Sequence, residues 1–335
     1  MKKSNYIVTV TYGDRWHLLK KALYSAKNEG FDRAVVVDNG AKIDISQLTK
    51  DEFGDFVDVV IMGKNTGSAG GFKAGMQRAI DLDADFLMLL DDDNELQPGC
   101  LDSLSLAYQE SALSVPQNSL AVLAYRSDRQ ADVAANIPFN GMNGNCAAFF
   151  GFHFLEVPFK LFRRTSVGRR WIARRPILPR VVVAIAPYSG MYFHQSVLKL
   201  HGLPNARFIL YADDTDFSYR LTRAGGEIVL ATKAKLIDLE LSWNVKARFN
   251  NTFDAILLGD SDFRAFYSTR NRAYFEENYS EDFKLIRNVN KFIYLTALYL
   301  RSIAVGRKAR FTLLIQAIRD GEAGRLGEHP DFLLN

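Results

Sequence analysis

Short apolar runs alternate with amphipathic stretches through the first third of the chain. Four runs have the composition of buried strands, at residues 6–11, 34–38, 57–62 and 86–91. Apolar residues recur at helical spacing over 18–26 and again from Phe72 to Ile80. This alternation predicts an α/β fold, in which helices cover a mostly parallel central sheet.

Polar residues stand at or just beyond the end of each predicted strand. They are Thr11, Asp38, Asn65 and Asp91. In α/β sheets of this kind, ligands bind beyond the carboxyl ends of the parallel strands. The sequence therefore predicts a binding site at one edge of the sheet.

A glycine-rich segment, residues 65–72, separates the third strand from the helix that follows it. It lacks the Gly-Lys-Ser/Thr of a P-loop and the spacing of a dinucleotide fingerprint. Gly70 and Gly71 would let the backbone approach a ligand closely, and the start of the helix would offer free N–H groups to an anion. A tight turn into a helix is the alternative interpretation.

Three consecutive acids, Asp91, Asp92 and Asp93, follow the fourth strand. At the end of a buried strand they repel one another unless a cation or several hydrogen-bond donors face them. Hard oxygen ligands suit Mg²⁺ or Mn²⁺, and either ion would neutralise a diphosphate leaving group. An acidic triplet alone is also typical of a solvated loop.

A second acidic motif, residues 213–216, comes much later in the chain. Phe217 and Leu221 fit the buried stripe of a short helix, so Asp213 and Asp214 would lie at its N-terminus. The helix dipole favours negative charge there, and capping alone would explain both acids. A carboxylate in this position could also remove a proton from a bound hydroxyl.

Composition fits a soluble α/β enzyme with one large domain or two smaller ones. Hydrophobic residues make up 48% and charged residues 24% of the 335 residues, and the net charge is +4. Cys100 and Cys146 indicate neither a disulfide framework nor a zinc site. The first apolar run is too short and too β-branched for a signal peptide, so we expect a cytoplasmic protein.

Each of two basic segments is compatible with more than one interpretation. Residues 160–182 are rich in arginine and form either a mobile flap near phosphates or a solvated loop. Residues 284–310 have the pattern of a basic amphipathic helix. Such a helix can lie on an anionic membrane, whereas its apolar part is too short to span one. Packing on the catalytic domain or in a homo-oligomer is equally compatible with the pattern.

These motifs, in this order, resemble family 2 glycosyltransferases, which have the GT-A nucleotide-sugar-binding fold. The matching stretches are 8–15, 35–39, 65–75, 87–98, 188–193, 202–221 and 267–271. The Asn-x-Gly-x-x-Gly-Gly-Phe segment with the later acid triplet is similar to bacterial galactofuranosyl- and rhamnosyltransferases of surface polysaccharides. The resemblance implies an inverting transferase that depends on Mn²⁺ or Mg²⁺. It implies a UDP-galactofuranose donor, with dTDP-rhamnose as the alternative, and a lipid-linked or growing glycan acceptor such as O-antigen.

The resemblance also assigns roles to particular residues. Asp214 would be the catalytic base. The donor nucleotide sugar would be held by Thr11, Arg15, Asp38, Asn65, Gly70, Gly71, Asp91 and Asp92. The acceptor would contact Asp213, Tyr188, Ser189 and Gly190. Asp93 would bind the metal. Relatives often complete the metal site with a histidine about two dozen residues beyond the base; here Asp238, with Glu240 behind it, is the nearest substitute.

The predicted organisation is a catalytic domain over residues 1–275 and a helical extension over 276–335. The catalytic domain would have a nucleotide-binding half (about 1–110) and an acceptor half (about 111–275). We expect no nucleic-acid partner and peripheral contact with an anionic membrane. Two rivals stay open: a nucleotidyltransferase, which would release pyrophosphate, and a non-catalytic nucleotide-sugar-binding subunit.

Overall fold

The computed structural model describes residues 3–139, 142, 147–240, 252–259, 261–279 and 283–334. Cys146 lies outside the described residues. So do the last residues, 241–243, of the region that relatives use to complete their metal site.

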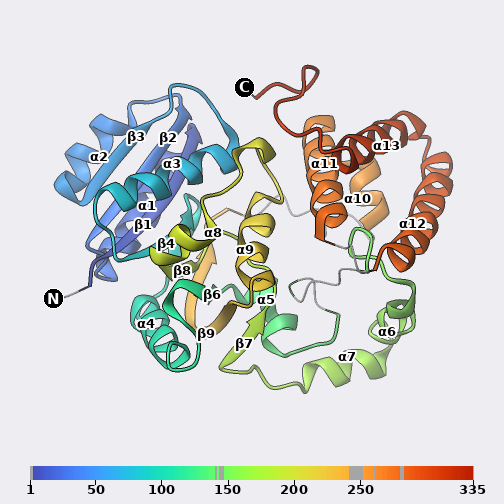
Figure 1. Ribbon diagram of the computed structural model, residues 1–335, viewed down its shortest axis with the longest axis horizontal. Helices are drawn as coiled ribbons and strands as arrows, with labels where there is room; N and C mark the ends of the chain where they lie inside the picture. Colours follow the sequence, from blue (N-terminus) through green and yellow to red (C-terminus); the bar gives the residue numbers. More distant parts are fainter. Residues whose placement is uncertain are drawn as a thin grey trace.

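A nine-stranded sheet forms the centre of the described molecule (Figure 1). Its strands lie in the order β3-β2-β1-β4-β8-β6-β9-β5, and β7 pairs with β9. The strands are β1 (Asn5–Gly13), β2 (Arg33–Ala41), β3 (Val57–Ile61), β4 (Phe86–Asp91), β5 (Asn94–Leu96), β6 (Leu120–Tyr125), β7 (Arg180–Val183), β8 (Met191–His194) and β9 (Glu227–Asp238). All four strands predicted in the first third are confirmed.

Most strands of this sheet run in the same direction. The pairs β1–β2, β2–β3, β1–β4 and β6–β9 are parallel, whereas β8 lies antiparallel between β4 and β6. The carboxyl ends of β1, β2, β4 and β6 therefore meet at one edge. Thr11 is the register partner of Asp38, and Val10 is the partner of Asp91. The predicted parallel sheet and the predicted polar edge are both confirmed.

Helices cover both faces of the sheet, and each face has its own apolar core. On one face, α1 (Trp16–Asn28), α2 (Ile45–Phe53) and α4 (Cys100–Ser111) pack on the strands. On the other face lie α3 (Gly67–Asp81), α5 (Ser127–Ala134), α8 (Ser196–His201) and α9 (Asp213–Arg223). Aliphatic residues that alternate along each strand supply the two cores, because successive side chains point to opposite faces.

The C-terminal region is helical, as expected. It consists of α10 (Thr252–Leu258), α11 (Asp262–Tyr279), α12 (Lys284–Ala304) and α13 (Lys308–Glu322), which lie to one side of the sheet (Figure 1). The boundary predicted after residue 275 falls inside α11. No helix among the described residues is long and apolar enough to cross a membrane.

The arginine-rich segment is more structured than a loop. It contains α6 (Val157–Phe162) and α7 (Ser166–Ala173), and its last residues enter β7. Arg180 at the start of β7 pairs with Glu110 of α4. The segment predicted as a flap over 160–182 therefore ends inside the central sheet.

Candidate active site

Acidic residues from distant parts of the sequence gather at the polar edge of the sheet. Asp91, Asp92 and Asp93 stand where β4 ends, and Asp213 and Asp214 begin α9. The two groups are close enough for the charge of Asp214 to act on Asp91. The structure thus brings the two predicted acidic motifs into one site.

Asp92 is held by the protein itself. Its carboxylate accepts a hydrogen bond from Thr11 Oγ1 at 2.7 Å and from Arg15 Nε at 3.0 Å. The Arg15 guanidinium also donates to Asp93 at 3.1 Å and to Glu240 at 2.8 Å. Burial raises the pKa of Asp92, and the contacts with Arg15 and Thr11 oppose that rise. Thr11, Arg15 and Asp92 therefore form one structural unit beneath the site.

Asp38 fixes the last residues of β2, and Asn65 fixes the loop that follows β3. Asp38 Oδ1 accepts hydrogen bonds from the backbone N–H groups of Gly40 and Ala41, at 3.2 and 2.7 Å. Asn65 Oδ1 accepts one from Gly67 N at 3.0 Å. Direct contact of either residue with a nucleotide stays a prediction.

The start of α3 differs from the expected open anion site. Asn39 Oδ1 accepts from Thr66 N at 2.9 Å, Asn65 accepts from Gly67 N, and the Ile209 carbonyl accepts from Ala69 N at 3.1 Å. These three N–H groups are therefore already satisfied. The loop before α9 supplies one of these acceptors, because Ile209 lies directly against this end of α3.

The glycines of α3 serve close packing inside the protein. A Cβ on Gly71 would lie 2.6 Å from Val10 Cγ1, and one on Gly70 would lie 2.5 Å from Thr66 Oγ1. Gly71 is thus required because α3 crosses β1 at short range. Close packing therefore explains these glycines without a ligand. Approach of a ligand to their backbone stays a prediction.

Arg126 is a central residue of the site that the sequence analysis missed. It follows β6, is 5% exposed, and its Nη1 lies 3.5 Å from Asp238 Oδ1. Its positive charge opposes the raised pKa values of Asp91 and Asp214. Residues 120–125 form an apolar run that is followed directly by the charged Arg126, and a charged residue at the end of an apolar run is the signal that identified Asp91.

The carboxyl group of Asp91 has a raised pKa and no hydrogen-bond donor among the described residues. Burial raises its pKa to about 7, the charges of neighbouring aspartates add to the rise, and Arg126 opposes it. Its side chain accepts no hydrogen bond from the residues that the structure describes. A half-buried carboxyl without a donor can accept one from a ligand hydroxyl.

Asp213 and Asp214 have different surroundings although they are adjacent. Burial and the negative charge of Asp214 raise the pKa of Asp213 to about 8, and Ser68 Oγ donates to its carboxylate at 2.9 Å. Burial also raises the pKa of Asp214, but Thr215 and Arg126 favour its charged form. The two carboxyl groups therefore titrate as a pair, in which Thr215 and Arg126 favour the negative charge on Asp214.

The Asp214 carboxylate is only partly engaged. Thr215 donates to Oδ1 through its backbone N–H at 2.7 Å and its hydroxyl at 3.2 Å. Among the described residues, no donor contacts Oδ2. An ionised oxygen without a donor at the polar edge of the sheet is suited to accept a proton from a bound hydroxyl.

The three residues predicted to bind the acceptor lie just before β8 and are buried. Tyr188 packs against Phe72 with ring centroids 4.5 Å apart, and Ser189 donates to Asn94 and accepts from Asp91 N at 3.2 Å. Gly190 adopts φ +93°, and a Cβ there would lie 2.9 Å from a methyl carbon of Leu236. Contact of these three residues with an acceptor stays a prediction.

Asp93 and Asp238 converge on one amide group. Asn94 Nδ2 donates to Asp93 at 3.2 Å and to Asp238 at 2.9 Å. Burial raises the pKa of Asp93, as do the charges of Asp238 and Glu240, while Arg15 opposes the rise. Asp238 also pairs with Arg126 and Arg129.

The chemistry of this pair fits a divalent cation in part. Two hard carboxylate ligands are typical of Mg²⁺ or Mn²⁺ sites that take their other ligands from phosphate and water. The described residues contain no group of three His, Cys, Asp or Glu side chains placed to hold a metal ion. A bound metal would therefore depend on oxygens of the substrate.

A strained loop presents α9 to the site. Ile209, Tyr211 and Ala212 all have positive φ, at 67°, 68° and 60°, which is costly for residues with a side chain. The fully buried Asn271 of α11 donates from Nδ2 to the carbonyls of Phe208 and Leu210, both at 2.7 Å, and of Tyr211 at 3.0 Å. The helical C-terminal region thus holds the loop that sets the position of Asp213 and Asp214.

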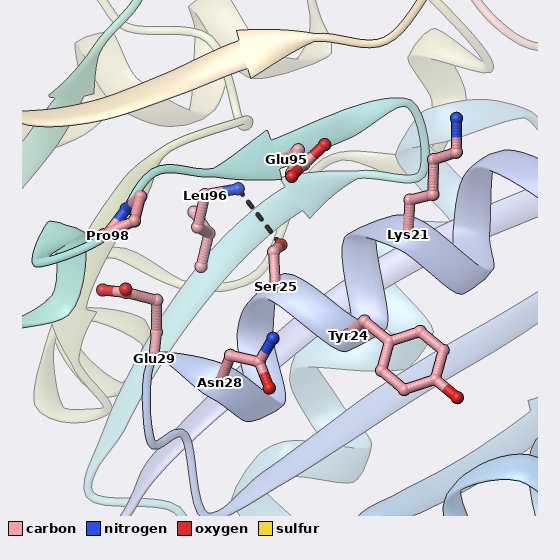
Figure 2. Close-up of a pocket in the computed structure, with 8 residues that line it drawn as sticks. All are labelled: Lys21, Tyr24, Ser25, Asn28, Glu29, Glu95, Leu96 and Pro98. Carbon is pink, nitrogen blue, oxygen red and sulfur yellow. Dashed lines mark hydrogen bonds between the residues drawn. The ribbon is translucent and has the colours of Figure 1, made fainter.

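A hollow of about 430 Å³ elsewhere on the surface lacks such chemistry. Its lining comes from α1 and the segment after β4 (Figure 2), namely Lys21, Tyr24, Ser25, Asn28, Glu29, Glu95, Leu96 and Pro98. Ser25 Oγ accepts from Leu96 N at 3.1 Å, and Glu29 accepts from Gly99 N and Leu101 N. Because these groups hold the protein's own chain, we place the active site at the sheet edge.

Comparison with known proteins agrees with this geometry. Residues 6–171 match the model of glycosyl transferase family 2. Over 228 residues the chain is 26% identical to galactofuranosyltransferase GlfT1 of Mycobacterium tuberculosis, in the strains CDC 1551 / Oshkosh and H37Rv. That alignment covers 67% of this chain and 66% of the relative.

Solved structures share the fold at low identity. The crystal structure of GalNAc-T7 with UDP, GalNAc and Mn²⁺ aligns with a TM-score of 0.50 and 13% identity, over 86% of this chain and 54% of that one. S. aureus TarS aligns with a TM-score of 0.50 and 10% identity, over 96% and 55%. The chain spans about half the length of both structures. It carries a GT-A fold, and its residues 6–171 form a glycosyl transferase family 2 domain.

Proposed function

We propose that this glycosyltransferase is an inverting, metal-dependent enzyme that moves galactofuranose from UDP-galactofuranose to a hydroxyl of a lipid-linked or growing surface glycan. The 26% identity to galactofuranosyltransferase GlfT1 supports the choice of sugar. The observation that carries the mechanism is the position of Asp214 at the start of α9, where Thr215 donates two hydrogen bonds to Oδ1 of its carboxylate and none to Oδ2. We retain rhamnose from dTDP-rhamnose as the alternative donor.

In this mechanism Asp214 removes the proton of the acceptor hydroxyl. The hydroxyl oxygen then forms a bond to the anomeric carbon while the bond from that carbon to the diphosphate oxygen breaks. The nucleoside diphosphate leaves with the bonding electrons, and a single displacement inverts the anomeric configuration. The charge of Arg126 favours the ionised form of Asp214 before the reaction and thereby keeps the base ready.

Asp93, with Asp238, would hold the divalent cation. A bound cation supplies positive charge that neutralises the leaving diphosphate. Asp91 accepts a hydrogen bond from a hydroxyl of the donor, for which its uncontacted carboxyl is suited. Thr11, Arg15 and Asp92 keep the floor of the site rigid beneath the nucleotide.

Donor binding should be selective and should depend on the metal. By calorimetry, we expect the protein to bind UDP-galactofuranose with Mn²⁺ more tightly than UDP-galactopyranose or dTDP-rhamnose. Chelation with EDTA should reduce transfer by roughly 10²-fold or more, because several kcal/mol of charge stabilisation are lost. Re-addition of Mn²⁺ or Mg²⁺ should restore transfer.

Two matched variants test whether the metal requirement depends on Asp93. Asp93→Asn should lose the stimulation by Mn²⁺, whereas Asp55→Asn, a change at an exposed aspartate remote from the site, should keep it. Full transfer by rigorously metal-free enzyme would refute the metal requirement. Tightest binding of dTDP-rhamnose would move the donor assignment to rhamnose.

Asn271→Ala should lower kcat, because Asn271 holds the loop that positions Asp213 and Asp214. Without the side-chain amide, three carbonyls of the strained loop lose their donor, and Asp214 shifts. Misplacement of a catalytic group by about 1 Å can cost roughly 10²-fold in rate. Steady-state kinetics should therefore show a large loss in kcat and a smaller change in the KM for the donor.

Asn290→Ala is the matched control. Asn290 is also fully buried in the C-terminal helices and contacts backbone groups of Ala147 and Phe154, at 2.8 and 2.9 Å. Both variants should lose thermal stability, but only Asn271→Ala should lose kcat per folded molecule. Equal kcat in the two variants would show that Asn271 only stabilises the fold.

A further inference from the structure

Charge is strongly segregated along this chain. Residues 157–212 contain no Asp or Glu, and neither do residues 283–319. The second segment comprises all of α12 and most of α13, and the first comprises α6 and α7. A chain with a net charge of only +4 thus presents two cationic segments without local acids.

The outer face of α12 is apolar although solvent surrounds it. Its inner face is formed by Arg287, Asn290, Tyr294, Leu298 and Ser302, which are buried. On the opposite side, Leu285 is 80%, Phe292 72% and Leu300 60% exposed, and Val289 and Ile303 continue the same stripe. Exposed apolar stripes of this length mark surfaces that bind another protein or a membrane.

The α6–α7 segment continues this surface. Phe154 N donates to Asn290 Oδ1 at 2.9 Å, so the start of the segment lies against α12. Leu155, Leu161 and Val167 are all more than half exposed. Figure 1 shows α6 and α7 on the same side of the molecule as α12.

Arginines accompany these apolar side chains. Five exposed arginines form no ion pair with any residue that the structure describes: Arg164, Arg169, Arg170, Arg174 and Arg175. Arg175 lies over the ring of Trp171 at 4.4 Å, and that ring packs against Phe159 and Phe162. The segment is therefore an ordered surface on which positive charge and apolar groups are interleaved.

We propose that the outer face of α12, together with residues 154–175, is a docking surface for a lipid bilayer with anionic headgroups. Apolar side chains of such a surface enter the boundary between headgroups and acyl chains, while basic side chains contact anionic lipids. A second copy of the chain fits less well, because it would bring together the arginines of residues 164–175 of both copies, which have no acidic partner among the described residues. The helix would lie in the membrane plane, since no described helix can cross a bilayer.

Vesicle sedimentation of the full chain tests this docking surface. The protein should sediment with vesicles that contain about one third phosphatidylglycerol and should stay in solution with pure phosphatidylcholine. Binding should fall severalfold between about 50 and 500 mM salt, because surface charges are screened. The double variants F292S/L300S and R170E/R174E should each reduce the bound fraction at least about tenfold.

The double variant I61S/L113S is the matched control. Ile61 and Leu113 are 67% and 89% exposed but lie on β3 and just after α4, so vesicle binding should be unchanged. All variants should keep wild-type melting temperatures and transfer to a soluble acceptor, which separates this surface from the catalytic proposal. Equal sedimentation by wild type and both surface variants would overturn the proposal. So would a dimer in analytical ultracentrifugation that F292S/L300S dissociates while vesicles bind neither protein.

Discussion

Asp214→Asn is expected to lower kcat by roughly 10²–10⁴-fold, which is the usual effect of removing a general base. The substitution keeps the shape of the side chain and removes the proton acceptor. Donor affinity measured by calorimetry should stay close to wild type, because the proposed donor contacts lie on other residues. Near-normal turnover would remove Asp214 from the base role, and lost donor binding would place it in the donor pocket.

Asp213→Asn is the matched control for this result. Burial and the charge of Asp214 raise the pKa of Asp213 to about 8, which favours its neutral form at neutral pH, and asparagine resembles that form. We therefore expect kcat within severalfold of wild type and an unchanged acid limb of the pH–rate profile. A loss as large as that of Asp214→Asn would exchange the two assignments.

Asp213 should also make the stability of the folded protein depend on pH. Its pKa is about 8 in the folded protein against an ordinary value of 3.8, so the folded state binds the proton more tightly. Its contribution to stability is present below about pH 4 and is lost as pH rises toward about 8. The melting temperature of Asp213→Asn relative to wild type should therefore increase from about pH 5 to about pH 9.

Arg126→Met is expected to destabilise the protein by about 3–5 kcal/mol, as is typical when one partner of a buried charge cluster is removed. Arg126 is 5% exposed, contacts Asp238, and its charge also acts on Asp91 and Asp214. Without it, these carboxylates repel one another inside the protein. Denaturant unfolding should show the loss, and kcat should fall because Asp214 would retain its proton.

Arg78→Met provides the comparison for this variant. Arg78 pairs with Asp58 at 2.7 Å, but its side chain is 43% exposed. Such exposed pairs contribute little to stability, because solvent screens their charges. If Arg126→Met lost no more stability than Arg78→Met, the buried cation would not be central to the site.

The sequence was sufficient for the fold and for the gathering of polar residues at one edge of the sheet, because both rest on local patterns. Each apolar run in the first third became a strand, and parallel pairing then placed Thr11, Asp38 and Asp91 at one edge. The acidic motif at Asp213–Asp214 was found because an N-terminal acid before a buried helical stripe is also a local signal.

The partners of these residues were not predictable from local patterns. Arg15 joins Asp92 to Glu240, which is 225 residues away from Arg15, and Asn271 reaches back to the loop at 208–211. Long-range side-chain contacts of this kind depend on the complete packing. The packing role of the glycines of α3 was not predicted for a similar reason, since the nearness of Val10 to Gly71 appears only when the helix lies on the sheet.

The proposed mechanism is tested most directly by product analysis after incubation of the enzyme with UDP-galactofuranose, Mn²⁺ and a lipid-linked glycan acceptor. We expect one UDP released per sugar transferred and a galactofuranoside whose anomeric configuration is opposite to that of the donor, with both products absent for Asp214→Asn. Release of pyrophosphate, retention of the anomeric configuration, or no turnover by folded enzyme with any UDP- or dTDP-sugar would contradict it.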